Sequence, residues 1–277
     1  MLKWRHSISA RRGSDRPQRT AVRARDRRLE AALAGDEIDI RFQPQIDPVS
    51  GRILGVEALA RWAEVASPEA LFARATAAGL AERLSRTIQR KSLRLVGQWS
   101  GVLGDLRLSL NILPQDLDRK GFEAWLIDEI RHAGIDPRRV TAEIIESALL
   151  SDRPAVAARL GFLRDHGVEV AIDDFGTGYA NLVYLTSLPL DAIKIDRAMV
   201  AGLVGQERDR IVVKAMISMA RELGLKVVVE GVESLAQLDL IAAWGCDLYQ
   251  GFLGAGALGV AELARFVATS NALADAA

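Results

Sequence analysis

The chain has 277 residues, of which 49% are hydrophobic, and its 36 Lys/Arg are balanced by 36 Asp/Glu. This length and composition suit one large globular domain or two small ones. The single cysteine, Cys246, excludes an intrachain disulfide and fits a reducing cytoplasm, and no apolar run reaches the roughly 18 residues that a membrane-spanning helix needs.

The charge is unevenly distributed along the chain. Residues 1–28 hold ten Lys/Arg and two Asp/Glu, a net charge of +8, and the remaining residues hold 26 and 34, a net charge of −8. The acidic body argues against a nucleic-acid duplex as the main partner. Residues 1–27 lack the apolar core of a secretory signal, so we expect a flexible basic leader or linker. A contact with an anionic membrane or nucleic acid, and a transit peptide, are the alternatives.

From about residue 28 the pattern becomes regular. A short helix is predicted over residues 28–35, where a glycine ends it. Apolar or alternating runs after it predict eight strands. These runs cover residues 38–44, 53–61, 107–112, 140–146, 168–174, 191–196, 226–231 and 247–252. We expect the folded domain to span residues 28–271, with 272–277 as a tail.

Amphipathic helical stretches separate most of these strands. They include residues 121–134, 154–167, 210–224 and 235–245, and each ends in glycine. Ser67-Pro68 has the pattern of a helix N-terminus, and Ser234 with Gln237 fits a capping box. Strands that alternate with helices predict an α/β fold, and eight of them predict a TIM-like (β/α)8 barrel.

One connection departs from this pattern. Only residues 45–52, with a Ser-Gly turn, separate the first two strands, whereas a parallel crossover needs about a dozen residues or more. We therefore predict that the first strand runs antiparallel to the second.

Polar residues lie at or near the carboxyl ends of seven consecutive predicted strands, where barrels of this type carry their functional groups. They are Glu57, Asn111, Glu146, Asp173 with Asp174, Lys194, Glu230 and Gln250. Taken singly, each has a structural interpretation, such as a turn or helix cap. Their alignment on one rim favours a functional site.

The charges of this rim indicate its cofactor. Five carboxylates and one ammonium sum to −4, and two like charges 4 Å apart repel by ~4 kcal/mol at an effective dielectric constant of ~20. Two divalent cations would cancel this charge. An all-oxygen ligand set without a converging histidine suits Mg²⁺ or Mn²⁺, and such a pair assists in-line phosphoryl displacement.

The adjacent acids Asp173 and Asp174 are then a metal-binding platform. Phe175, Gly176, Thr177 and Gly178 follow them, and the glycines would let this loop bend steeply over a ligand.

These residues lie in stretches that resemble the EAL-domain phosphodiesterases of cyclic di-GMP. The stretches are "FQPQIDPVSGRILGVEALARW", "LSLNILPQDL", "EIIESALL", "IDDFGTGYANLVYLTSLPLDAIKID" and "VVVEGVESLAQLDLIAAWGCDLYQGF". The resemblance covers residues 28–270 and implies a barrel with an antiparallel first strand. It also implies two-metal hydrolysis of cyclic di-GMP to linear pGpG in the bacterial cytoplasm.

The resemblance further implies roles for individual residues. Glu57, Asn111, Glu146 and Asp173 would bind one metal ion, and Asp173, Asp174 and Glu230 would serve the second ion or its water. Lys194 would orient or activate the attacking water, and Gln250 would hydrogen-bond within the metal–water shell. Gln43, Leu59 and Arg61 would contact the substrate, with Arg61 suited to a phosphate. A homodimer and an N-terminal sensor or cyclase domain in a longer chain are also implied.

The sequence departs from the family pattern in the segments that would line the substrate site. The stretch after "RW" is short, Thr76 replaces a glutamate, Ile145 replaces a threonine, and "LGAGAL" follows "QGF" where larger side chains are usual. The alternative function is therefore a weak or inactive domain that acts as a cyclic di-GMP receptor or protein-interaction module. An enolase-type lyase is a third hypothesis from the rim acids and lysine alone, but such enzymes carry a capping domain before the barrel.

Overall fold

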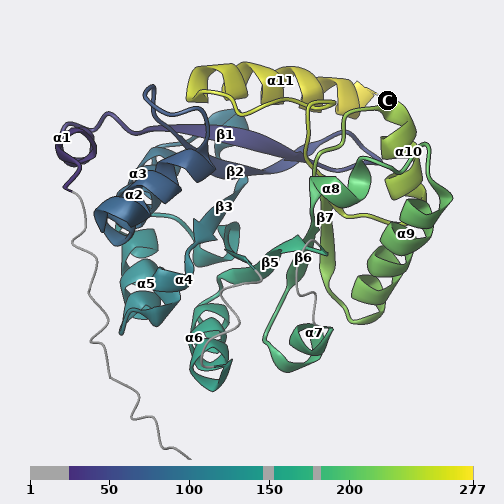
Figure 1. Cartoon of the computed structure of the whole chain (residues 1–277). Helices are drawn as coiled ribbons and strands as arrows, with labels where there is room; N and C mark the ends of the chain where they lie inside the picture. The colour runs from purple at the N-terminus through teal and green to yellow at the C-terminus, as the bar shows by residue number, and fades with distance from the viewer. Residues whose placement is uncertain (1–24, 146–152, 177–181, 277) are drawn as a thin grey trace, which may run out of the picture.

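A computed structural model describes residues 25–145, 153–176 and 182–276. Its eight strands form one closed barrel in chain order, surrounded by helices (Figure 1). The strands are β1 (Asp39–Ile46), β2 (Ile53–Arg61), β3 (Arg107–Ile112), β4 (Val140–Ile145), β5 (Glu169–Phe175), β6 (Ala192–Ile195), β7 (Lys226–Val229) and β8 (Leu248–Tyr249).

The first strand confirms the topological prediction. β1 is antiparallel to both β2 and β8, while the other neighbouring pairs are parallel. The β1–β2 connection is a tight turn in which the Asp47 carboxylate accepts hydrogen bonds from the backbone N–H groups of Val49 and Ser50, both at 2.8 Å. Gly51 follows with a φ of 70°, which glycine adopts without strain.

The helices cover the outside of the barrel (Figure 1). They are α1 (Arg27–Ala34), α2 (Pro68–Ala78), α3 (Ala81–Gly97), η1 (Gly101–Leu103), α4 (Pro114–Asp118), α5 (Phe122–His132), η2 (Pro137–Arg139), α6 (Arg153–Asp165), α7 (Val183–Ser187), α8 (Arg197–Val200), α9 (Glu207–Glu222), α10 (Leu235–Ala243) and α11 (Val260–Ala276). Among the described residues no helix combines the length and hydropathy that crossing a membrane requires.

Helix ends follow the local sequence signals. Ser67 accepts a hydrogen bond from the Ala70 backbone N–H at the start of α2, and Ser234 and Gln237 form the predicted capping box at the start of α10. α11 continues through residues 272–276, which the sequence pattern had set apart as a tail.

Strand periodicity decides what faces the barrel interior. Along β2 the buried Val56, Ala58 and Ala60 alternate with Glu57 and Leu59, so the apolar set packs under the helices and Glu57 points inwards. At the amino-terminal end of the parallel strands, Glu169 pairs with Arg107 at 2.6 Å and with Lys226 at 2.9 Å. These ion pairs join β3, β5 and β7 at the end opposite the predicted site.

Candidate active site

Seven strands bring polar side chains to one end of the barrel. Each strand contributes one residue of its inward-facing set or the residue directly after it, so side chains far apart in sequence meet. The seven are Glu57, Asn111, Glu143, Asp173, Lys194, Glu230 and Gln250.

Lys194 lies at the centre of this group. Its side chain is only 1% exposed, and its ammonium contacts carboxylate oxygens of four residues. The distances from Nζ are 2.7 Å to Glu230, 2.8 Å to Glu143, 3.0 Å to Asp173 and 3.4 Å to Glu57. An ion this deeply buried is tolerated only when it is paired and hydrogen-bonded, as it is here.

Two amide side chains complete the hydrogen bonding of the carboxylates. Asn111 Nδ2 donates to Glu57 Oε1 at 2.8 Å. Gln250 Nε2 donates to Glu57 Oε2 at 2.8 Å and to Glu230 Oε1 at 2.9 Å. Together with Lys194, these two amides hold both oxygens of Glu57 in place.

The carboxylates form two sets with one shared member. Glu57, Glu143 and Asp173 offer oxygen atoms within 4.8 Å of one another, and so do Asp173, Asp174 and Glu230. Oxygen ligands suit hard divalent cations, and a carboxylate common to both sets can bridge two of them. The donor set therefore fits a pair of divalent cations.

The buried carboxylates outnumber the positive charges around them, and this raises the pKa of some of them. Burial raises the pKa of Glu230 to about 7; Lys194 opposes this shift, and Asp173 adds to it. Burial also raises the pKa of Glu143 well above its usual range, against the attraction of Lys194. One ammonium thus does not satisfy all the acids around it, and further cations would be stabilised there.

Glu57 shows the opposite balance. Burial would raise its pKa, but the Lys194 charge and the hydrogen bonds from Gln250 and Asn111 outweigh burial and lower it. Glu57 is therefore ionised and fixed in orientation, which are two properties of a good metal ligand.

The chain turns sharply after the shared carboxylate. Asp174 has a φ of 56°, which non-glycine residues seldom adopt, and its N–H donates to Asp173 Oδ1 at 3.0 Å. Burial, the Asp173 charge and then the Asp196 charge raise the pKa of Asp174 to about 6. Phe175 is buried, and Gly176 follows with a φ of 106°. Thr177 and Gly178, the rest of the predicted loop, lie outside the described residues.

The three predicted substrate contacts lie on the β1–β2 side of the site. Gln43 is the register partner of Glu57 across the antiparallel pair, and its Nε2 donates to the Ala255 carbonyl at 3.3 Å. Leu59 and Arg61 share the face of Glu57 because they follow it at two-residue spacing. All three are half-buried, so they border the cluster and still meet solvent.

This geometry agrees with a family match. Residues 26–257 match the EAL domain, a region that covers most of the chain. The chain belongs to the EAL domain family. The family and the barrel implied by the sequence resemblance are thereby confirmed.

Two curated relatives of this EAL domain come from Pseudomonas aeruginosa. Cyclic di-GMP phosphodiesterase PA2567 is 35% identical over 230 residues, which cover 81% of this chain and 39% of the relative. Cyclic di-GMP phosphodiesterase NbdA is 35% identical over 253 residues, which cover 86% and 31%. The chain thus spans between three and four tenths of the length of these relatives.

Solved structures of EAL domains share the fold. The PaMucR phosphodiesterase in complex with c-di-GMP superposes with a TM-score of 0.77 at 31% identity, covering 85% of this chain and 97% of that one. BlrP1 of Klebsiella pneumoniae, solved with manganese and cyclic di-GMP, gives a TM-score of 0.74 at 31% identity, covering 81% and 57%.

Sequence reasoning missed one member of the EAL-domain cluster. Glu146 was expected to supply the β4 carboxylate, and it lies outside the described residues. Glu143, three residues earlier, is 1% exposed and contacts Lys194. A carboxylate inside the mostly apolar run "VTAEII" was the available signal, because a buried acid needs a partner.

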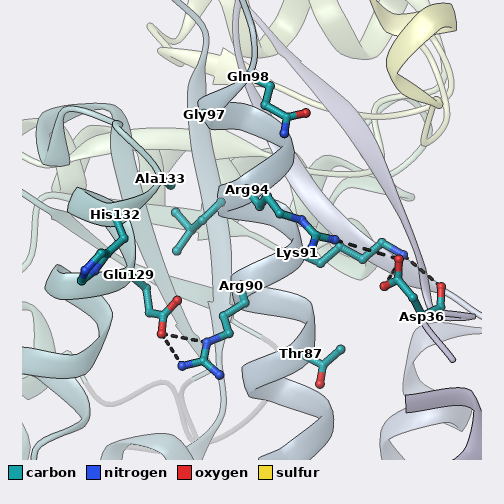
Figure 2. A pocket seen from close by; sticks show the side chains of 11 residues that line it. Asp36, Thr87, Arg90, Lys91, Arg94, Gly97, Gln98, Glu129, His132 and Ala133 are labelled. Atoms are coloured by element: carbon teal, nitrogen blue, oxygen red, sulfur yellow. Dashed lines mark hydrogen bonds and ion pairs between the residues drawn. The ribbon is translucent and has the colours of Figure 1, made fainter. Parts of the chain in front are cut away.

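A separate groove of about 540 Å³ lies between α3 and α5 (Figure 2). Its lining residues come from helices and their flanking turns, and none belongs to a strand. Two of its basic side chains are closely paired, Arg90 with Glu129 at 2.5 Å and Lys91 with Asp36 at 3.0 Å. Surface pairs of this kind hold helices together modestly and indicate no chemistry.

Proposed function

We propose that this EAL domain hydrolyses one phosphodiester bond of cyclic di-GMP to give linear pGpG, with two divalent cations, Mg²⁺ or Mn²⁺. The observation that carries the proposal is the pair of carboxylate sets that share Asp173 around a buried lysine. The relatives named as cyclic di-GMP phosphodiesterases, and the c-di-GMP and manganese complexes of similar domains, support the same substrate and cofactor.

The residues that would hold the cations are those of the two sets. Glu57, Glu143 and Asp173, with Asn111 beside them, would hold one, and Asp173, Asp174 and Glu230 the other. When bound, the cations would lower the pKa of a water molecule and stabilise negative charge that develops on the phosphoryl oxygens.

The chain's own residues would bind and orient the reactants. Arg61 would bind a phosphate oxygen of the substrate, and Gln43 would border the same pocket. Lys194, whose ammonium contacts carboxylates of both sets, would orient or activate the attacking water. In the reaction the water oxygen bonds to phosphorus, the bond from phosphorus to the 3′ oxygen breaks, and that oxygen leaves with a proton.

The assay is direct. Purified protein is incubated with cyclic di-GMP and Mn²⁺, Mg²⁺ or EDTA, and the product is followed by chromatography. We expect pGpG with a metal and none with EDTA. Glu57→Ala should abolish turnover, whereas Glu129→Gln, a carboxylate change in the α3–α5 groove, should leave turnover unchanged. Absence of product with both metals would contradict the proposal.

A receptor or protein-interaction module is the second candidate function. The segment after β8 is poor in large side chains, and its Ala255 carbonyl lies against Gln43, beside the expected substrate site. Phe252 in this segment is 76% exposed. Calorimetry with cyclic di-GMP and Ca²⁺ would separate the two functions: tight binding without turnover in Mn²⁺ supports the receptor.

The wider assembly also remains a prediction. A homodimer, an N-terminal sensor or cyclase domain and a cytoplasmic location are expected from the sequence resemblance. Light scattering of the purified chain measures the first of these.

A further inference from the structure

A buried glutamine lies directly beneath the candidate active site. Gln45 is on β1, next to β8, and is 4% exposed. Its Nε2 is 3.3 Å from Gln250 Oε1 and 3.3 Å from Ser109 Oγ. Its own Oε1 lies against Gly55 on β2, where a Cβ atom would come within 2.9 Å of it.

The donors and acceptors around Gln250 favour one orientation of its side-chain amide. Gln250 Nε2 lies 2.8 Å from Glu57 Oε2 and 2.9 Å from Glu230 Oε1 and donates to both oxygens. Its Oε1 then points the other way and needs a donor. Gln45 Nε2 is that donor.

The two orientations of a primary amide have almost the same shape, so packing alone does not choose between them. Rotated by half a turn, Gln250 would present its oxygen to the oxygens of Glu57 and Glu230. The hydrogen bond from Gln45 Nε2 stabilises the observed orientation, because Gln250 could rotate only by facing the Gln45 NH₂ group with its own NH₂ group or by rotating together with Gln45.

We propose that Gln45 is a positioning residue that holds the Gln250 amide in the orientation that fixes Glu57 and Glu230 for divalent cations. The proposal rests on the proposed function for its link to turnover, but its effect on metal binding stands independently. The alternative is that Gln45 is only a satisfied polar residue of the barrel core, without influence on the cluster above it.

The first test measures Mn²⁺ binding by calorimetry on the full chain. Gln45→Met keeps the length of the side chain and removes the donor. We expect it to weaken Mn²⁺ binding by about 10- to 100-fold, the range typical of residues that orient metal ligands. Ser109→Ala removes the other partner of Gln45 and leaves the contact with Gln250, so Mn²⁺ affinity should change less than threefold.

A double-mutant cycle separates positioning from general stability. In a Gln250→Met background, Gln45→Met should have no further effect on Mn²⁺ affinity, since no amide remains to be oriented. Undiminished Mn²⁺ affinity in Gln45→Met, or an equal loss in the Gln250→Met background, would overturn the proposal.

Two safeguards keep the test decisive. If Gln45→Met does not fold, Gly55→Ala replaces it, because the added methyl group displaces the Gln45 amide without changing that residue; weaker Mn²⁺ binding supports the proposal and unchanged binding refutes it. Another outcome is that the unmodified chain binds Mn²⁺, and Gln45→Met weakens this binding only when Gln250 is present, while no pGpG is produced. In that case the proposed function fails and the role of Gln45 stands.

Discussion

At the scale of single residues, Lys194 decides how much negative charge the barrel tolerates. Its ammonium contacts Glu57, Glu143, Asp173 and Glu230, and it is the cation common to all four. Removing one partner of a buried ion pair leaves the other without compensation, which costs about 3–5 kcal/mol. Lys194 is therefore part of the stability of the metal-free fold as well as of the proposed chemistry.

We expect Lys194→Met to abolish turnover and to lower the free energy of unfolding in EDTA by about 3–5 kcal/mol, measured by urea denaturation. Without the ammonium, the four carboxylates are easier to protonate in the folded state than in the unfolded state, so the deficit grows as pH rises. Lys226→Met is the control, because Lys226 is half exposed and its pair with Glu169 is worth at most about 1 kcal/mol. Equal losses in the two variants would contradict this role.

Glu143 and Glu146 give a matched pair of variants. Glu143→Gln removes a carboxylate from the set with Glu57 and Asp173, so we expect Mn²⁺ affinity and turnover to fall by about 100-fold or more, as loss of a metal ligand causes. Calorimetry and the pGpG assay measure the two effects. A larger loss in Glu146→Gln than in Glu143→Gln would instead support Glu146 as the metal ligand, as expected from the sequence.

Glu143 and Glu146 show why the sequence located most of the candidate site and not all of it. Strand-end position identified Glu57, Asp173 and Lys194, because the carboxyl ends of the parallel strands share one rim. It led to Glu146 and not to Glu143, since the residue that faces the barrel interior depends on register. In the barrel Glu143 is the register partner of Asn111, and register is set by neighbouring strands far away in the chain.

At the scale of elements, local sequence signals predicted where helices begin better than where strands end. The start of α2 and the capping box of α10 follow from residues adjacent in sequence, and the short turn at Asp47 forced β1 to be antiparallel. β8 is shorter than its apolar run. Gly251, two residues after the end of β8, lies so close to Val232 that a Cβ atom on Gly251 would come within 2.2 Å of the Val232 carbonyl oxygen, and this contact is invisible in the sequence.

A buried polar network also ties helix α3 to the end of β3. The Asp116 carboxylate is fully buried and accepts hydrogen bonds from Ser85 Oγ at 2.5 Å, Gln89 Nε2 at 3.1 Å and the Leu113 N–H at 3.1 Å. Gln89 Nε2 also lies 3.3 Å from the Asn111 carbonyl. Burial raises the pKa of Asp116 above 3.8 despite these hydrogen bonds.

The sign of the resulting pH dependence follows from this shift. Folded Asp116 binds its proton more tightly than the unfolded chain does, so its contribution to stability falls as pH rises from about 3.8 through the raised pKa. Asn at this position keeps an accepting oxygen and is neutral at every pH. We expect the melting temperature of Asp116→Asn, relative to the unmodified chain, to rise across this pH range and then level off.

Thermal unfolding between pH 4 and 8 measures the difference. Asp118→Asn is the matched control, because it removes the same charge from an exposed position of α4. Its difference in melting temperature from the unmodified chain should not change with pH. A flat difference for Asp116→Asn as well would mean that burial of this carboxylate costs no stability.

At the scale of the whole molecule, the barrel carries its charge unevenly. Ion pairs among Arg107, Glu169 and Lys226 join strands at one end, and an excess of carboxylates gathers at the other. Closure of the barrel holds these acids together, so their mutual repulsion lowers the stability of the whole fold. A ligand that relieves this repulsion must therefore stabilise the entire domain and not merely the site.

Divalent cations should consequently raise the melting temperature of the chain. A ligand present at 100 times its dissociation constant adds about 2.7 kcal/mol, and about 1 kcal/mol shifts the melting temperature of a domain of this size by about 2–4 °C. We expect Mn²⁺ to raise the melting temperature by about 5–10 °C and EDTA to reverse the rise. KCl at equal ionic strength should not reproduce it, because screening is weak for buried charges.

Asp173→Asn makes this test specific to the cluster. The substitution removes the one carboxylate shared by both sets, so the Mn²⁺-induced rise should disappear even though most of the acids remain. The metal-free variant should melt at or above the temperature of the metal-free unmodified chain, since one repelling charge is gone while Lys194 keeps three carboxylate partners. A rise of equal size in Asp173→Asn would mean that Mn²⁺ stabilises the chain elsewhere and would separate the acidic cluster from metal binding.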